Sequence, residues 1–179
     1  MVSVALYNFP KTMILRKATP GDAPRIWAIL QQAIAQRRKD GSEQWQSGYP
    51  NEQTVQDDLV NGRSYVLVEN EKVIACAAII FDGEPAYDDI TGKWLTDGSY
   101  ITVHRVATAD EVKGRGIATE LFKMIEELCV TEQIPSIRVD TNFDNIPMLK
   151  ILDRLQYTYC GEVFYIGAPR KAYEKVVLR

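Results

Sequence analysis

Two glycines one residue apart lie in the segment ADEVKGRGIATELF, which covers residues 109–122. Gly114 and Gly116 allow backbone conformations that residues with a Cβ rarely adopt, and Lys113 and Arg115 flank them. The apolar residues that follow have helical spacing, and the first turn of a helix has backbone N–H groups that attract anions. The segment therefore indicates a phosphate-binding turn. The alternative is that the glycines only shape a tight connection between a strand and a helix.

The strand that precedes this turn has a break in its pattern. In YITVHRVAT, the alternation of Ile101 and Val103 is out of phase with Val106. An extra residue in a strand, a β-bulge, changes the face that every later side chain occupies. We therefore expect a bulge near His104 and Arg105.

The remaining elements alternate between strand and helix patterns. We expect strands over 14–17, 64–69, 73–81, 100–108, 136–141, 157–166 and 171–178, and helices after Thr19, around Val55 and Leu59, from Gly116, and over 145–154. The first two of the strands after Val55 should form a hairpin, and 73–81 should be a central strand because it is apolar throughout. Residues 82–98 read as a surface loop, and GAPR at 167–170 as the turn before the last strand.

Composition sets bounds on the class of protein. The 179 residues, 46% of them hydrophobic and 25% charged, predict one domain over 13–179, with 1–12 as an N-terminal tail or an upstream start before Met13. The net charge of −3 argues against nucleic acid as a partner, and the longest apolar run, 73–81, is too short to span a membrane. Three cysteines without paired spacing favour a reducing cytoplasm and indicate no metal site.

The segment YITVHRVATADEVKGRGIATELF resembles motif A of the GNAT acetyltransferases, in which a bulged strand, a Q/R-x-x-G-x-G/A turn and a helix follow one another. The order of elements over 13–179 is similar as well. The resemblance implies an α/β GNAT fold, with a mixed central sheet of about seven strands and about four helices. It also implies an N-acetyltransferase that moves the acetyl group of acetyl-CoA directly to a primary amine, of a small molecule or a peptide, in a ternary complex.

The resemblance assigns cofactor contacts residue by residue. It implies that the backbone of Val106 and of its neighbour His104 receives the thioester and the pantetheine arm. It implies that the pyrophosphate is held by Lys113, Gly114, Arg115 and Gly116, with Ala118 and Thr119. Asn145 matches the asparagine that in many members hydrogen-bonds the pantetheine arm.

Two positions depart from the family pattern. Glu111 stands where the motif has Gln or Arg, which removes a common donor near the phosphates but leaves the backbone amides. Leu152 stands where many members place a tyrosine that protonates the departing thiolate. The general acid is therefore unassigned. Tyr157, Tyr159 and Cys160 are candidates by their order along the chain, but tyrosines on a late strand more often fill the core, and water alone can serve in that role.

An alkyl amine has a pKa of about 10.4, so some group must take its proton near neutral pH. His104 is the only histidine and belongs to the side-chain type that titrates closest to neutrality. It is the first candidate base; the alternative is that it only packs beside the cofactor. Asp140, at the end of the strand over 136–141, is the second candidate, and a solvated strand end is its alternative.

Aromatic and acidic residues of two loops are candidates for binding the acceptor. They are Trp45, Tyr49, Tyr87, Asp88, Asp89 and Trp94, and Tyr100 on the following strand should shape the same pocket. Aromatic rings and carboxylates suit a cationic amine. The alternative is that these rings only hold the loops against the core.

Other functions are consistent with the same pattern. Leu152 favours an acyl-CoA-binding protein with weak catalysis, and a glycine turn that binds nothing would leave a structural or interaction protein. No membrane partner is expected, and a homodimer is expected from the resemblance only.

Overall fold

One mixed sheet forms the scaffold of the protein. The computed structural model describes residues 13–178, so the predicted tail or upstream start at 1–12 lies outside the described residues. The strands are β1 (Met13–Lys17), β2 (Ser64–Glu69), β3 (Lys72–Ile80), β4 (Thr91–Gly92), β5 (Tyr100–Thr108), β6 (Ser136–Thr141), β7 (Thr158–Tyr165) and β8 (Ala168–Val176). The α-helices are α1 (Ala23–Lys39), α2 (Glu52–Val60), α3 (Ile117–Thr131) and α4 (Ile146–Arg154).

The sheet has eight strands where about seven were expected, in the order β1-β2-β3-β5-β6-β8-β7-β4. The additional strand is β4, which forms one edge of the sheet and pairs with β7 where Gly92 faces Gly161. A Cβ on Gly92 would lie 2.1 Å from the carbonyl oxygen of Cys160, so only glycine permits this approach. The predicted loop 82–98 is therefore attached to the edge of the sheet.

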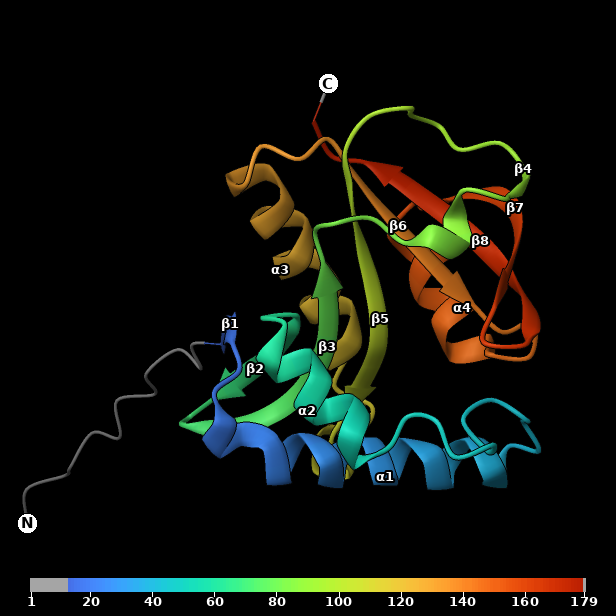
Figure 1. Ribbon diagram of the computed structural model, residues 1–179. Coiled ribbons are helices and arrows are strands. Elements are labelled where there is room, and N and C mark those ends of the chain that lie inside the picture. Colours follow the sequence, from blue (N-terminus) through green and yellow to red (C-terminus); the bar gives the residue numbers. More distant parts are fainter. Residues whose placement is uncertain (1–12, 179) are drawn as a thin grey trace, which may run out of the picture.

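Helices cover both faces of the sheet. β3 pairs with β2 and β5 in antiparallel orientation, which confirms the predicted hairpin and the central position of this strand. In Figure 1, α1 and α2 lie on the near side of the sheet and α3 lies behind it. The core side chains of α1 and α3 include Ile26, Ile29, Leu30, Leu121, Phe122 and Ile125. Among residues 13–178, no helix is long and apolar enough to cross a membrane.

The strands β5 and β6 are parallel and separate part of the way along. They pair only from Tyr100 to Thr102 on β5, opposite Ser136 to Arg138 on β6. Beyond these residues β6 pairs with β8 alone, and Figure 1 shows β5 and β6 diverging toward α1. The divergence leaves the backbones of both strands open to a ligand at the centre of the sheet.

The β7–β8 hairpin differs from its prediction. The turn consists of Ile166 and Gly167, both with positive φ, and Pro169 and Arg170 belong to β8 rather than to a turn. Proline is tolerated here because β8 pairs with β6 only from Lys171 onward, so the backbone of Pro169 lacks a neighbour on that side. Arg170 is therefore a residue of strand β8 and not of a turn.

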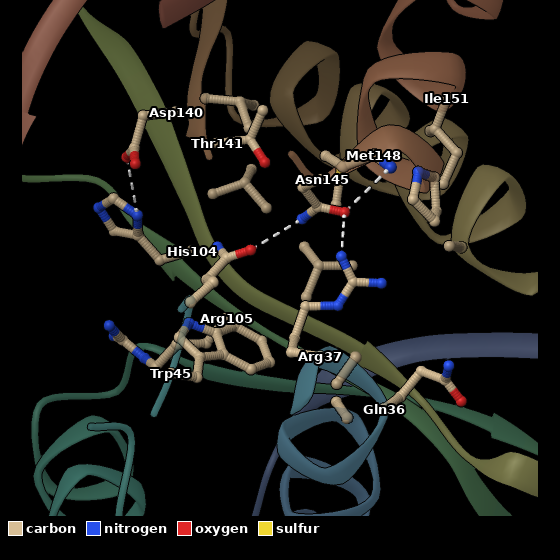
Figure 2. Close-up of a pocket in the computed structure, with 18 of the residues that line it drawn as sticks. Gln36, Arg37, Trp45, His104, Arg105, Asp140, Thr141, Asn145, Met148 and Ile151 are labelled. Carbon is tan, nitrogen blue, oxygen red and sulfur yellow. Dashed lines mark hydrogen bonds and ion pairs between the residues drawn. The ribbon is translucent and has the colours of Figure 1, made fainter. Parts of the chain in front are cut away.

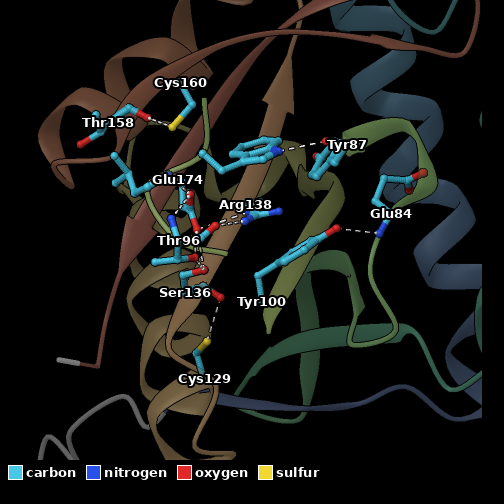
Figure 3. Close-up of polar contacts among 12 residues, drawn as sticks. Glu84, Tyr87, Thr96, Tyr100, Cys129, Ser136, Arg138, Thr158, Cys160 and Glu174 are labelled. Carbon is cyan, nitrogen blue, oxygen red and sulfur yellow. Dashed lines mark hydrogen bonds and ion pairs between the residues drawn. The ribbon is translucent and has the colours of Figure 1, made fainter. Parts of the chain in front are cut away.

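A buried ion pair holds the 82–98 loop over one face of the sheet (Figure 3). The Arg138 guanidinium lies between the rings of Trp94 and Tyr100, at 4.4 and 3.8 Å from their centroids. Its Nη2 donates to the backbone oxygen of Thr96, and its Nε faces the fully buried carboxylate of Glu174 at 3.3 Å. Because these groups satisfy one another, the loop has one defined position over β5 and β6.

Candidate active site

A β-bulge interrupts β5 where the sequence pattern changes phase. The register of β5 against β3 shifts so that Arg105 and Val106 together oppose Ala77, and Arg105 has a φ of 52°. The bulge predicted near His104 and Arg105 is therefore confirmed. It interrupts the ladder of β5 on the strand that borders the divergence from β6.

A cavity of about 530 Å³ occupies this divergence. It is bounded by β5, β6, α1, α4, the loop that follows α1, the start of α3 and the β7–β8 hairpin. It brings together eight of the predicted site residues, namely Trp45, Tyr49, His104, Val106, Lys113, Ala118, Asp140 and Asn145. These come from six separate segments of the chain, so the fold assembles them as one site.

The glycine turn, residues 113–116, lies at one end of this cavity, which its first residue, Lys113, lines. Gly114 and Gly116 have φ of 78° and 75°, and a Cβ on either would meet no atom within 4 Å. Gly116 is the N-cap of α3, and no side chain caps that helix. The predicted conformation is therefore present, with open space next to the first N–H groups of α3. Gly114, Arg115, Gly116 and Thr119 do not themselves line the cavity.

The basic side chains of the turn are paired with carboxylates. Lys113 lies 2.5 Å from Asp110, and Arg115 lies 2.6 Å from Glu69. We therefore expect the backbone N–H groups of this turn, rather than its basic side chains, to bind an anion.

His104 lies between two carboxylates. Its Nε2 is 3.0 Å from Glu84 Oε2. Its Nδ1 is 3.3 Å from Asp140 Oδ1, a contact that Figure 2 shows. The Tyr87 hydroxyl donates to the same Asp140 oxygen at 2.7 Å. The imidazole also stacks on the Tyr165 ring, with centroids 4.7 Å apart and planes 5° from parallel. The ring is therefore held on both edges and one face.

The charges of this group affect one another. Burial by itself would raise the pKa of Glu84, but the hydrogen bond and charge of His104 outweigh it and hold that pKa below its ordinary value. Burial, and then the neighbouring Asp140 carboxylate, raise the pKa of the Tyr87 hydroxyl well above its ordinary value. Tyr87 is therefore a proton-bearing donor to Asp140 at neutral pH.

Asn145, which lines the cavity at the start of α4, forms hydrogen bonds with three neighbouring residues. Its side-chain oxygen accepts from the backbone N–H of Met148, which caps α4, and from Arg37 Nη1 at 3.0 Å (Figure 2). Its amide nitrogen donates to Gln44 at 3.2 Å. Asn145 therefore joins α4 to α1 and to the loop that follows α1 across the cavity.

Tyr157 is buried in the core, away from the lining of the cavity. Its ring packs edge to face on Phe122 of α3, with centroids 5.9 Å apart, and burial raises the pKa of its hydroxyl well above the ordinary value. It does not line the cavity, and neither do Tyr159 and Cys160. Tyr157 as the acid stays a prediction, and its packing against α3 favours the alternative that a tyrosine at this point of the chain fills the core.

Tyr100 also lies outside the cavity lining. Its hydroxyl accepts a hydrogen bond from the backbone N–H of Glu84 at 3.2 Å, and its ring lies 6.3 Å from that of Tyr87. Tyr100 therefore positions the residues that contact His104 and Asp140, where a wall of the acceptor pocket was expected.

Three important neighbours were missed by the sequence pattern. Glu84 and Tyr165 contact His104, and Arg105 contacts the site from the bulge. Glu84 comes from a loop without periodicity, so the only local signal was its place before Pro85 as the N-cap of a short 3-10 helix.

Arg105 ties the bulge to α2 and to the acceptor loop. Its Nε and Nη2 donate to the two oxygens of Asp58, each at 2.7 Å, and its Nη1 donates to the Tyr49 hydroxyl. The side chain is 9% exposed. The positive φ of the bulge is what directs this side chain toward α2.

Arg105→Lys should lower the free energy of unfolding by about 2 kcal/mol, because lysine keeps the charge but loses the paired donors of the guanidinium. Urea unfolding measures the change. Arg154→Lys, an exposed position on α4, is the matched control and should shift stability by less than about 0.5 kcal/mol. Equal shifts in the two variants would contradict a structural role for the Arg105 pair.

The model of the family described as "Acetyltransferase (GNAT) family" matches residues 28–157. A solved GNAT-family acetyltransferase from Streptococcus agalactiae is 38% identical, with a TM-score of 0.84, and the alignment covers 92% of this chain and 95% of that one. A GNAT-family acetyltransferase from Listeria monocytogenes is 17% identical, with a TM-score of 0.74 and coverage of 92% and 94%.

A third solved structure is an aminoglycoside acetyltransferase, AAC(6')-Ib, in complex with coenzyme A. It is 17% identical, with a TM-score of 0.68 and coverage of 92% and 95%. The two structures at 17% identity share the fold with this chain. A search of the curated proteins finds no match.

Proposed function

Because the chain belongs to the GNAT acetyltransferase family, matched over residues 28–157, we propose that it transfers the acetyl group of acetyl-CoA directly to a primary amine in a ternary complex. The observation that carries this proposal is the cavity at the divergence of β5 and β6. It extends from the bulged strand and Lys113, the residue next to the two glycines, to His104 and Asp140, which form a network with Glu84.

The residues present fit acetyl-CoA. The open space beside Gly114 and Gly116 and the uncapped N-terminus of α3 suit the pyrophosphate. The interrupted ladder at Val106 suits the amide groups of the pantetheine arm. Thr141 Oγ1 is buried, has no hydrogen-bond partner and belongs to a residue that lines the cavity, so a ligand amide would satisfy it. Acetyl-CoA supplies an activated acetyl thioester there.

We assign the first proton acceptor to Asp140. Both ring nitrogens of His104 face carboxylates, and of these two carboxylates only Asp140 lines the cavity. The Glu84 side chain is 13% exposed and lies on the far side of the ring. Asp140, His104 and Glu84 therefore form a path by which a proton leaves the amine site, with His104 as the central carrier rather than the first acceptor.

The cysteines support direct transfer. Cys76, Cys129 and Cys160 are buried and do not line the cavity. Burial raises the pKa of Cys76 to about 12 and that of Cys129 to about 12, which removes thiolate at neutral pH. All three are free thiols, which also supports the proposed cytoplasmic location. The expected homodimer stays a prediction.

The experiment that tests the function is release of coenzyme A thiol from acetyl-CoA in the presence of a panel of primary amines. Release that depends on the amine supports the transferase. The second candidate, a binding protein with weak catalysis, is favoured by the buried Leu152 at the position of the family's tyrosine. Acetyl-CoA binding without thiol release for any amine would support that candidate instead.

Glu84→Gln should lower kcat by about tenfold, less than loss of the group that takes the proton itself, because glutamine keeps a polar contact to His104 but cannot accept its proton. The pKa of Glu84 in the folded protein is below its ordinary value, so the carboxylate stabilises the fold at pH values above the ordinary pKa of a glutamate. This stabilisation is lost as the pH falls through the lowered pKa. The stability deficit of Glu84→Gln should therefore be present at pH 7 and shrink in acid.

Thermal unfolding between pH 3 and pH 8 measures this second effect. Glu127→Gln, at an exposed position of α3, is the matched control and should change neither quantity. A deficit that is constant with pH would contradict the ion pair between Glu84 and His104.

A further inference from the structure

An arginine without a counter-charge lines the cavity. Arg170 is 8% exposed, and its Nη1 donates to the side-chain oxygen of Asn142. Its Nε has no hydrogen-bond partner, and within the described part of the chain no carboxylate forms an ion pair with it. A guanidinium has five N–H donors, and burying its charge without an anion is unfavourable. Such a group is typical of a site that a ligand completes.

The other cationic side chains that line the cavity are compensated. Arg37 lies 2.7 Å from Asp40, Arg105 lies 2.7 Å from Asp58, and Lys113 lies 2.5 Å from Asp110. An anion that enters the cavity therefore meets one uncompensated guanidinium among the described residues, that of Arg170.

Arg170 lies on the same face of the sheet as Asp140. Residues two apart on a strand share a face, so Arg170 points to the side of Ala172, which is opposite Asp140 on β6. Ala172 packs with Tyr87, whose hydroxyl is bonded to Asp140. Arg170 is thus about 7 Å along β8 from the level of Asp140. One small molecule can reach both groups.

The phosphates of coenzyme A are not the anion in question. Val139 lies next to Asp140 on β6 and therefore on the opposite face, where it packs into the main core with residues of α3. The glycine turn precedes that helix, so the phosphate site belongs to the end of the cavity at α3. Arg170 belongs to the other side, with Tyr165 and His104.

We propose that the acceptor is an amino-acid-like amine that carries a carboxylate, and that Arg170 binds this carboxylate while Asp140 receives the amine. This rests on the proposed function, since the amine end is located by the proton path. The guanidinium suits a carboxylate because its donors match two oxygens. The apolar remainder of the molecule would contact the rings of Trp45, Tyr49 and Tyr165, which line the same cavity.

The test is equilibrium binding to the protein saturated with coenzyme A, a complex in which no acetyl group can be transferred. The probes are pairs that differ by one carboxylate: phenylalanine and 2-phenylethylamine, leucine and 3-methylbutylamine, and lysine and cadaverine. We expect at least one amino acid to bind about tenfold or more tightly than its decarboxylated partner. If no amino acid exceeds its partner, the proposal is overturned.

Arg170→Gln should remove this preference, with about tenfold weaker binding of the amino acid and unchanged binding of the amine and of coenzyme A. Arg170→Lys keeps the charge, tests the site if the glutamine variant does not fold, and should weaken only the amino acid, by several-fold. Equal weakening of both probes, or weaker binding of coenzyme A, would contradict the assignment.

The two proposals fail separately. Binding of an amino acid through Arg170, together with no thiol release for any amine of the panel, would leave the carboxylate site standing and remove the transferase function. Acetylation of amines without regard to a carboxylate would support the transferase and overturn the carboxylate site.

Discussion

Gly116→Val is expected to weaken acetyl-CoA binding by about 100-fold, which corresponds to about 2.7 kcal/mol. Gly116 has a φ of 75°, a conformation that a β-branched residue rarely adopts, and it directly precedes the first N–H groups of α3. Since no side chain caps these groups, a displaced first turn loses the proposed phosphate contacts together. Isothermal titration calorimetry with acetyl-CoA measures the effect.

A matched control separates backbone strain from binding. Gly62 has a φ of 65°, ends the turn after α2 and, like Gly116, has no atom within 4 Å of an added Cβ. Gly62→Val should therefore lower the melting temperature by a similar amount and leave acetyl-CoA affinity unchanged. If both variants bind like the native chain, the turn does not hold the cofactor. Affinity lost in both would mean that the loss reflects general destabilisation.

Asp140→Asn is expected to lower kcat by about 100- to 1000-fold at pH 7 and to leave acetyl-CoA affinity unchanged. The substitution keeps the shape of the side chain and an oxygen that can accept from the Tyr87 hydroxyl, but it removes the group that takes the proton of the amine. Initial rates with a responsive amine, measured together with acetyl-CoA binding, give both quantities.

The pH dependence distinguishes proton transfer from a structural effect. As pH approaches the pKa of the amine, about 10.4, more acceptor arrives neutral and the deficit of Asp140→Asn should shrink. Asp153→Asn, an exposed position on α4, is the control and should be near wild type throughout. An equal deficit at pH 7 and pH 9.5 would remove Asp140 from the proton path.

Local patterns predicted most of the elements. The strands 64–69, 100–108 and 136–141 have the bounds that were expected, because each is an apolar or alternating run that ends at a turn. The bulge was predictable for a similar reason: a change of phase between Val103 and Val106 has few other physical causes. The left-handed turn at Gly116 was indicated by residue type alone.

Features that depend on contacts between residues far apart in the sequence were not predicted. Nothing within the 82–98 loop indicates that Arg138 and Glu174 hold it over the sheet, so its strand β4 and the contact of Glu84 with His104 were missed. Arg170 was expected in a turn because proline and glycine precede it, whereas pairing with β7 extends β8 through it.

The sequence by itself determined the order of elements, the bulge, the glycine turn and the family, because each depends on residues adjacent in the chain. The tertiary structure alone decided which charges meet. It placed Asp140 and Glu84 on either side of His104, moved Tyr157 into the core and left Arg170 without a counter-charge. The physical reason is that burial and electrostatic interactions depend on distance in space, and these residues come from segments that only the packing of the chain brings together.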